Sequence, residues 1–194
     1  MARPRNLERA AQIKDTVSRL FAEKGYHATS MRDVGNQIGM SKSSMYNYFK
    51  SKEDILFHLM NDAMDEALET LKAICRADHT PEEKLNAVLD FYACYYAGDQ
   101  DRLTLLVNEL PSLSDEHQEI IKRKDRDYVK LIRSILDDLT DAGRMRAIHP
   151  TVATFAFFGM VHYTIKWYKK EGAVRPGELA RLFVEIFTKG ILKP

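Results

Sequence analysis

The sequence is short of the features that mark secreted, membrane-spanning and metal-binding proteins. Its two cysteines, Cys75 and Cys94, are too few and too isolated for a disulfide framework or a zinc site, and we expect both to be small buried apolar residues. No apolar run approaches the about 18 residues that cross a bilayer. The basic start, Met-Ala-Arg-Pro-Arg, lacks the apolar stretch of a signal peptide. These absences predict a cytoplasmic protein without a membrane partner.

Enzyme motifs are also missing. The chain has no glycine-rich phosphate loop, no His-x-Glu or Cys-x-x-Cys metal spacing and no local nucleophile signature, and its six histidines are scattered. The paired acids Asp137 and Asp138 fall where a solvated helix face is expected. We therefore predict no enzymatic activity, no catalytic residue, no metal and no cofactor. A helical enzyme without a recognisable motif is the weaker alternative.

The alternating pattern of a β-strand is absent as well, and no internal repeat or low-complexity segment occurs. Apolar residues recur instead with the helical period, so the sequence predicts an all-α fold of about nine helices. These comprise a first helix that stops at Gly25, two short helices on either side of Gly39, a fourth from Ser51 to about Cys75, and helices near residues 81–97, 101–110, 114–142, 150–170 and 176–191.

The segment Ser30–Leu56 is the most informative part of the chain. Ser30, with Asp33 three residues later, gives the cap of a short helix. Gly39 then gives a tight turn, and Ser41 caps a second short helix. Two short helices joined by a glycine turn are typical of the helix-turn-helix, whose second helix enters the major groove of DNA. The charge distribution agrees: the first 60 residues carry ten Lys and Arg against six Asp and Glu, a net +4, whereas the remainder carries 19 against 22, a net −3.

Three sequence blocks lie within this segment or just before it. They are Phe-Ala-Glu-Lys-Gly-Tyr at 21–26, Thr-Ser-Met-Arg-Asp-Val at 29–34 and Tyr-Asn-Tyr-Phe-Lys-Ser-Lys-Glu at 46–53. Together they resemble the TetR family of one-component transcriptional regulators over roughly residues 8–56. The resemblance implies a helix-turn-helix DNA-binding domain over residues 1–54 and a helical ligand-binding and dimerisation domain over residues 55–194. A small three-helix bundle without a DNA partner is the structural alternative for the first domain.

The second short helix has two faces that suit a DNA reader. Met45 and Phe49, four residues apart, should face inward, which leaves polar side chains for the groove. Lys42 and Asn47 are the expected base readers, since Lys donates to guanine and Asn pairs with adenine. The predicted DNA-contacting residues are Arg3, Arg5, Thr29, Ser30, Ser41, Lys42, Ser43, Ser44, Tyr46, Asn47, Tyr48 and Lys52.

Other members of this set are expected to bind the DNA backbone. Free N–H groups at the helix start beside Thr29 and Ser30 favour a phosphate. The resemblance implies a second phosphate clamp at Tyr48 and Lys52. Two arginines ahead of the first helix, Arg3 and Arg5, are predicted to form an arm that reaches a neighbouring groove.

The resemblance also implies that the last two helices, Thr151–Tyr168 and Pro176–Leu192, form a four-helix bundle with a second copy of the chain. Small and large residues alternate along the first of them, and an apolar stripe at i, i+3, i+4, i+7 runs along the second. A face buried within one chain explains both patterns nearly as well.

Aromatic side chains on several of the later helices, with a few polar tips, suit an apolar ligand that has a polar end. Plain helix core is an equally good explanation of the aromatic spacing. The predicted ligand-binding residues are Phe91, Tyr95, Asn108, Tyr128, Ile132, Phe158 and His162.

The segment His162–Gly172 is similar to one in TetR-family regulators of fatty-acid and sterol breakdown, which respond to acyl-CoA thioesters. Lys166, Lys169 and Lys170 would supply cations for the CoA phosphates, although a solvated basic face fits them equally. We therefore predict a repressor that binds a palindromic double-stranded DNA operator as a homodimer. A small hydrophobic effector, with acyl-CoA as the leading candidate, is expected to release it. A TetR-type regulator of multidrug efflux is the alternative.

Overall fold

The computed structural model describes residues 4–193, with the side chains of residues 13–193 other than Lys42 and Ala97. Three of the residues predicted to contact DNA are affected by these limits: Arg3 and the side chains of Arg5 and Lys42 lie outside the described part.

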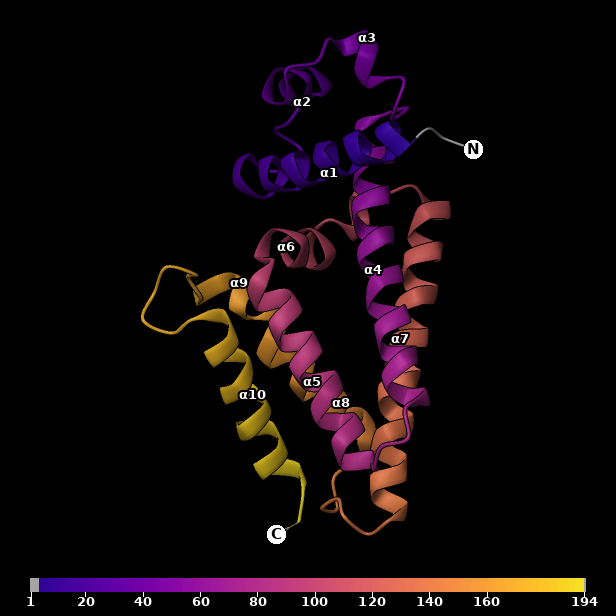
Figure 1. Ribbon diagram of the computed structural model, residues 1–194, viewed down its shortest axis with the longest axis vertical. Helices are drawn as coiled ribbons and strands as arrows, with labels where there is room; N and C mark the ends of the chain where they lie inside the picture. The colour runs from indigo at the N-terminus through magenta and orange to yellow at the C-terminus, as the bar shows by residue number, and fades with distance from the viewer. Residues whose placement is uncertain (1–3, 194) are drawn as a thin grey trace. The chain divides into compact units, whose positions relative to one another are not determined.

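Helices account for nearly all regular structure in the described residues (Figure 1), and the all-α prediction is confirmed. The one strand-like feature among them is an isolated antiparallel bridge between Met145 and Leu192. The expected helix over residues 150–170 is two helices, because the chain turns at Tyr163. The helices are α1 (Pro4–Lys24), α2 (Met31–Ile38), α3 (Lys42–Met45), α4 (Lys52–Arg76), α5 (Pro81–Gly98), α6 (Gln100–Asn108), the 3₁₀ turn η1 (Leu110–Ser112), α7 (Asp115–Asp141), α8 (Pro150–His162), α9 (Thr164–Trp167) and α10 (Pro176–Ile191).

The chain divides into two compact units. The first unit contains the residues up to Ala63 together with Asp101–Ile121, and the second contains Met64–Gln100 and the residues from Lys122 onward. The long helices α4 and α7 contribute residues to both units. The functional division at residues 54 and 55 remains a prediction.

In the first unit, local hydrogen bonds set the ends of α2. The side-chain oxygen of Ser30 accepts from the N–H of Asp33 (3.2 Å), and the Asp33 carboxylate accepts from the N–H of Ser30 (2.8 Å). This reciprocal pair is a capping box, as the sequence predicts. At the other end Gly39 has a φ of 67°, a left-handed conformation that glycine adopts without a steric penalty.

The helix-turn-helix is held together by a small apolar core. Val34 and Met45 are fully buried and Phe49 is nearly so, which confirms the inward orientation predicted for Met45 and Phe49. The turn is also close-packed: a Cβ added to Gly35 would lie 2.8 Å from the carbonyl oxygen of Met40. The α2–α3 geometry therefore depends on the absence of a side chain at Gly35.

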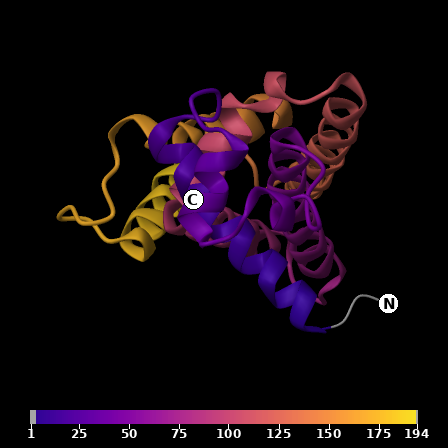
Figure 2. The same cartoon turned by 90° about the horizontal axis from the view of Figure 1, so that it is seen from above.

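In the second unit, α10 lies alongside α5 (Figure 1), and α8 contacts both. A second capping box, between Thr80 and Glu83, begins α5. Rings from all three helices meet in the core, where the Phe157 ring centroid lies 5.8 Å from that of Tyr92 and 5.2 Å from that of Phe187. The loop between α9 and α10 projects from this unit (Figures 1 and 2).

The expectation that both cysteines are buried is wrong. Cys75 is half-buried and Cys94 is exposed. Cys94 follows the buried residues Tyr92 and Ala93 on α5, and its side chain lies on the solvent-facing side of that helix.

Candidate functional site

The short helix α3 presents polar side chains on the surface. Ser43 and Asn47 are exposed, and Tyr46 is 46% exposed, a large value for an aromatic residue. The side-chain oxygen of Ser41 accepts from the N–H of Ser44 (3.2 Å) and lies 2.9 Å from that of Ser43. Ser41 therefore caps the helix, while its neighbours display hydroxyl, phenol and amide groups.

The helical bonding continues beyond α3. The N–H groups of Tyr48 and Phe49 both donate to the carbonyl of Met45, at 3.0 and 3.1 Å. Because Phe49 is buried beside Met45, this extra turn fixes the segment that carries Tyr46 and Asn47. Tyr48, predicted to clamp a phosphate, is half-buried.

At the start of α2 the predicted phosphate contacts already have partners within the protein. Thr29 is buried, and its hydroxyl donates to the carbonyl of Gly25 at 2.8 Å. The hydroxyl of Ser30 donates to Asp33 at 2.6 Å. Hydrogen bonds from the Ser30 side chain and backbone, together with Lys24 at 3.0 Å, hold the pKa of Asp33 far below its usual value. The ionised Asp33 carboxylate therefore occupies part of this anion-favouring helix end.

Lys52 has an intramolecular role that local sequence does not reveal. Its Nζ donates to the carbonyls of Tyr26 and Thr29, both at 2.8 Å, and lies 4.2 Å from the centroid of the Tyr26 ring. Burial lowers the pKa of Lys52, and the nearby Glu109 opposes this shift. Lys52 therefore ties the first turn of α4 to the turn that precedes α2.

The second unit brings together three of the predicted ligand-binding residues. His162 stacks on Phe158, with ring centroids 5.7 Å apart and 5° between the planes, and Tyr128 lies 6.2 Å from Phe158. Tyr92, outside the predicted set, lies at the centre of this group: its hydroxyl hydrogen-bonds to Nε2 of His162, and its ring lies 5.7 Å from Tyr128. We call Tyr92, Tyr128, Phe158 and His162 the aromatic cluster.

Burial dominates the electrostatics of the aromatic cluster. It raises the pKa of Tyr92 and of Tyr128 well above the usual value and lowers the pKa of His162. All three groups are therefore held neutral near pH 7. The hydroxyl of Tyr128 is buried without a hydrogen-bond partner among the described residues, which is a costly arrangement unless another group can reach it.

The remaining predicted ligand-binding residues are spread more widely. Ile132 is buried on α7. The rings of Phe91 and Tyr95 contact each other on α5 at 5.4 Å, and the Tyr95 hydroxyl donates to Glu66 at 2.8 Å. Asn108 is exposed at the end of α6, in the first unit.

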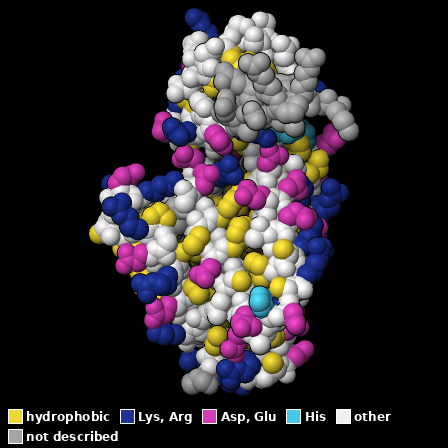
Figure 3. Space-filling view, in the orientation of Figure 1, with side chains coloured by type: hydrophobic (Ala, Val, Ile, Leu, Met, Phe, Trp, Pro, Cys, Tyr) yellow, Lys and Arg dark blue, Asp and Glu magenta, His cyan; other side chains and the backbone are white. Residues whose placement is uncertain are grey.

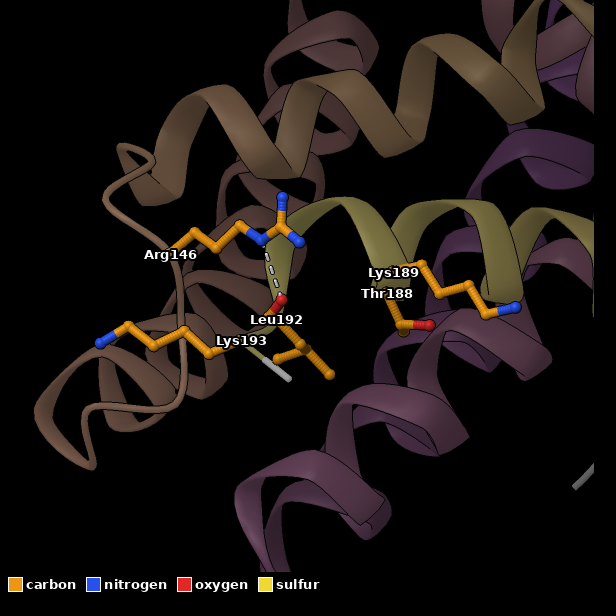
Figure 4. Close-up of a pocket in the computed structure, with 5 residues that line it drawn as sticks. All are labelled: Arg146, Thr188, Lys189, Leu192 and Lys193. Atoms are coloured by element: carbon orange, nitrogen blue, oxygen red, sulfur yellow. Dashed lines mark hydrogen bonds between the residues drawn. The ribbon is translucent and has the colours of Figure 1, made fainter.

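A surface cavity of about 320 Å³ lies at the C-terminal end of α10 (Figure 4). Arg146 at its edge donates from Nε to the carbonyl of Leu192 at 3.1 Å. Lys189 and Lys193 point away from each other (Figure 4), so the cations do not converge on a shared anion. None of the predicted ligand-binding residues lines this cavity; its lining residues are Arg146, Thr188, Lys189, Leu192 and Lys193.

One side of α8 is apolar and exposed. Val152 is 62% exposed and Phe155 is 55% exposed, and Tyr163 after the helix is 66% exposed, while Phe157 and Phe158 are buried. On α10, Ile186 is 61% exposed, whereas Phe187 faces the core. On the face seen in Figure 3, acidic and basic side chains are interspersed over the middle, and basic side chains follow one another along the right-hand edge.

Two parts of the chain match known protein families. Residues 13–59 match the family described as bacterial regulatory proteins, tetR family, and residues 78–191 match the tetracyclin repressor-like C-terminal domain. The chain belongs to the TetR family of transcriptional regulators. The match spans both the helix-turn-helix and the helices that carry the aromatic cluster, and it identifies a DNA-binding regulator rather than an enzyme.

Relatives within the family are similar over nearly their whole length. The fatty acid metabolism regulator protein of Bacillus subtilis is 26% identical over 93% of this chain and 94% of its own. The transcriptional repressor KstR2 of Mycolicibacterium smegmatis is 24% identical over 94% of this chain and 90% of its own. The structure of AibR in complex with isovaleryl coenzyme A and operator DNA has 27% identity and a TM-score of 0.82, covering 92% of this chain and 97% of AibR.

Neither a metal site nor a membrane-spanning helix is found in the described residues. No group of three or more His, Cys, Asp or Glu side chains that could hold a metal ion occurs among the described residues. Within the same part of the chain, no helix is both long and apolar enough to cross a membrane.

Proposed function

We propose that this TetR-family protein is a repressor that binds a palindromic operator as a homodimer and is released by a hydrophobic effector, with acyl-CoA as the leading class. The observation that carries the DNA-binding part is the capped, exposed α3 within a tetR-family helix-turn-helix. Among the predicted DNA contacts, Ser43, Tyr46 and Asn47 combine exposure with a buried anchor beside them. A DNA-binding regulator must share a compartment with its operator, and we therefore also propose a cytoplasmic location.

The dimer proposal rests on the exposed side of α8. Val152, Phe155 and Tyr163 are each more than half exposed although they are large and apolar. Exposed apolar side chains gathered on one helix mark an interaction surface. A second copy of the chain is its proposed partner, because one short α3 offers few base contacts and two copies related by a two-fold axis would read a palindrome.

The dimer proposal can be tested by sedimentation of two variants. Phe155→Glu places a charge in the centre of the exposed α8 face and is expected to give a monomer with an unchanged helical spectrum. Val107→Glu is the matched control, since Val107 is also exposed but lies on α6. A Phe155→Glu protein that remains dimeric would contradict the proposed interface.

The effector proposal rests on the aromatic cluster. Its buried Tyr128 hydroxyl has no partner among the described residues, and a ligand carbonyl or hydroxyl would satisfy it. The surrounding rings would cover an apolar chain. Two of the compared relatives support the acyl-CoA class: one is named for fatty acid metabolism, and AibR binds isovaleryl coenzyme A.

The experiment is a fluorescence-anisotropy titration of the protein on DNA that flanks its own gene. Acyl-CoA thioesters of increasing chain length are added to the complex, with free coenzyme A as the control. We expect release by one range of chain lengths and none by free coenzyme A. Full retention of the DNA at saturating thioester would reject the acyl-CoA proposal, and release by cationic drug-like compounds instead would favour the efflux alternative.

A pair of tyrosine variants sharpens this test. Tyr128→Phe removes the unpartnered hydroxyl, and Tyr168→Phe removes a hydroxyl that already donates to the carbonyl of Val174. If the effector uses the Tyr128 hydroxyl, Tyr128→Phe should weaken the response to the effector by roughly threefold to tenfold, the value of one hydrogen bond, and Tyr168→Phe should not. Equal responses in both variants would contradict the assignment of Tyr128.

A further inference from the structure

The segment Leu110–His117, which comprises η1 and the first residues of α7, is bonded to the first turn of α4. Glu53 of α4 accepts hydrogen bonds from the N–H of Ser114 at 3.1 Å and from Nδ1 of His117 at 2.7 Å. Both partners of the ion pair are partly shielded from water, with the side chain of Glu53 28% exposed and that of His117 25% exposed. All of these residues belong to the first unit.

An aromatic contact fixes the orientation of the histidine. The ring of Phe57, one helical turn after Glu53, stacks on the imidazole of His117 with centroids 3.8 Å apart and 7° between the planes. His117 is therefore held by its edge through Glu53 and by its face through Phe57. Two independent contacts on one helix make the position of His117 specific.

The residue beside Glu53 continues this connection to the helix-turn-helix. Lys52 donates to the carbonyls of Tyr26 and Thr29, and Thr29 immediately precedes the capped start of α2. Neighbouring residues of one helix turn thus bond α7 on one side and the start of α2 on the other. The first turn of α4 therefore connects the Glu53–His117 bond with the turn that precedes α2.

A second, weaker contact joins the same segment to the α1–α2 turn. The side-chain oxygen of Ser112 lies 3.1 Å from Nε2 of His27 and donates to Glu109 at 2.7 Å. The His27 side chain is 80% exposed, so water screens this contact and little energy is expected from it. The contact at Glu53 is the stronger of the two.

We propose that Glu53 and His117 are positioning residues for DNA binding, and that protonation of His117 strengthens operator binding by tightening the α7–α4 contact. This inference rests on the DNA-binding part of the proposed function. Neither residue touches the DNA-reading surface; both act through the first turn of α4 and Lys52. A protonated imidazole makes a charge-assisted bond to a carboxylate, which is about twice as strong as the neutral bond that remains after deprotonation.

Several charged groups lie close to His117. Burial alone would raise the pKa of Glu53, but the hydrogen bonds from His117 and Ser114 outweigh it and lower that pKa, so Glu53 stays ionised. On α4, His58 also contacts the Phe57 ring and pairs with Asp54 at 3.6 Å. On α7 itself, Asp115 and Glu116 lie in the first turn.

The test measures operator affinity from pH 6 to pH 8 at constant ionic strength, using the DNA that flanks the gene. A histidine changes charge over this range. We expect the wild-type affinity to fall by roughly fivefold between pH 6 and pH 8, which corresponds to the difference between a charged and a neutral hydrogen bond. His117→Gln, which keeps a donor but cannot be protonated, should lose most of this pH dependence.

Two further variants complete the design. His58→Gln removes another histidine beside Phe57 whose ion pair lies within α4, so it should retain the wild-type pH profile. Glu53→Gln removes the charge from the other side of the bond and should flatten the profile as His117→Gln does. Circular dichroism at both pH values establishes that each variant is folded. If His117→Gln does not fold, the pH profile of Glu53→Gln tests the positioning role instead.

The outcomes separate this inference from the proposed function. Wild-type binding with the same pH profile in His117→Gln and Glu53→Gln would overturn the positioning role while leaving the proposed function intact. A loss of pH dependence in His58→Gln instead would also overturn it. Absence of specific binding by the wild type at every pH would reject the DNA-binding proposal itself.

Discussion

The helix-turn-helix and the aromatic cluster are built in different ways. In the first, bonds between residues a few positions apart set the structure: Ser30 and Asp33 cap α2, Gly39 ends it and Ser41 caps α3. In the second, contacts join residues far apart in the chain, such as Tyr92 and His162, which are separated by 70 positions. The helix-turn-helix is therefore specified mainly by hydrogen bonds between residues close in sequence, and the interior of the second unit mainly by side-chain packing.

The largest expected effect is on stability, from a substitution in the packed core of the second unit. Phe157→Ala removes a ring that is 2% exposed and contacts Tyr92 and Phe187, so it leaves a cavity. We expect a loss of about 3–5 kcal/mol in the free energy of unfolding, measured by urea denaturation. Trp167→Ala, an exposed aromatic residue in the same unit, is the control and should cost less than about 0.5 kcal/mol. Similar losses in both would show that burial at Phe157 does not govern stability.

The next effect is on the close-packed turn of the helix-turn-helix. Gly35→Ala places a methyl group 2.8 Å from the backbone oxygen of Met40, which cannot move without displacing the turn. We expect a destabilisation of about 1–3 kcal/mol and a loss of operator affinity, measured by denaturation and anisotropy. Gly190→Ala meets no atom within 4 Å in α10 and should be neutral or stabilising. Normal DNA binding by Gly35→Ala would contradict the tight-turn argument.

A smaller effect compares the same capping chemistry in the two units. Ser30→Ala and Thr80→Ala each remove the side-chain acceptor of a capping box. Each should cost about 1 kcal/mol of stability by thermal denaturation. Only Ser30→Ala should also reduce operator affinity, because α2 supports α3. Equal losses of DNA affinity in the two variants would remove the distinction between the units.

The smallest effect is a change in pH dependence. Burial lowers the pKa of His162, so the unfolded chain binds a proton at this position more readily than the folded protein. The resulting stability is fully present above the unfolded pKa of about 6.5 and is lost as the pH falls through the window below it. His162→Gln should therefore show a smaller fall in melting temperature between pH 7.5 and pH 5.5 than the wild type. An identical fall would show that His162 does not contribute.

The parts of the fold that were predictable from sequence are those with local signals. The cap at Ser30, the glycine turn and the inward orientation of Met45 follow from spacing of a few residues. The partners of Lys52 lie 23 and 26 positions earlier in the chain, and no local pattern indicates them.

Long-range packing explains the remaining differences from expectation. The central place of Tyr92 in the aromatic cluster depends on how α5, α7 and α8 meet, and helical periodicity does not specify that. The number and spacing of cysteines do not indicate which side of a helix is covered, so they do not predict the exposure of Cys94.

The most direct test of the account is a nuclease footprint of the protein on the DNA that flanks its own gene. We predict a protected region with two inverted half-sites whose centres are separated by about one turn of DNA or more. A double variant, Tyr46→Ala with Asn47→Ala, should fold normally and lose this protection, because both side chains are exposed and are proposed to contact the DNA. No protection by the wild type, or unchanged protection by the double variant, would contradict the account.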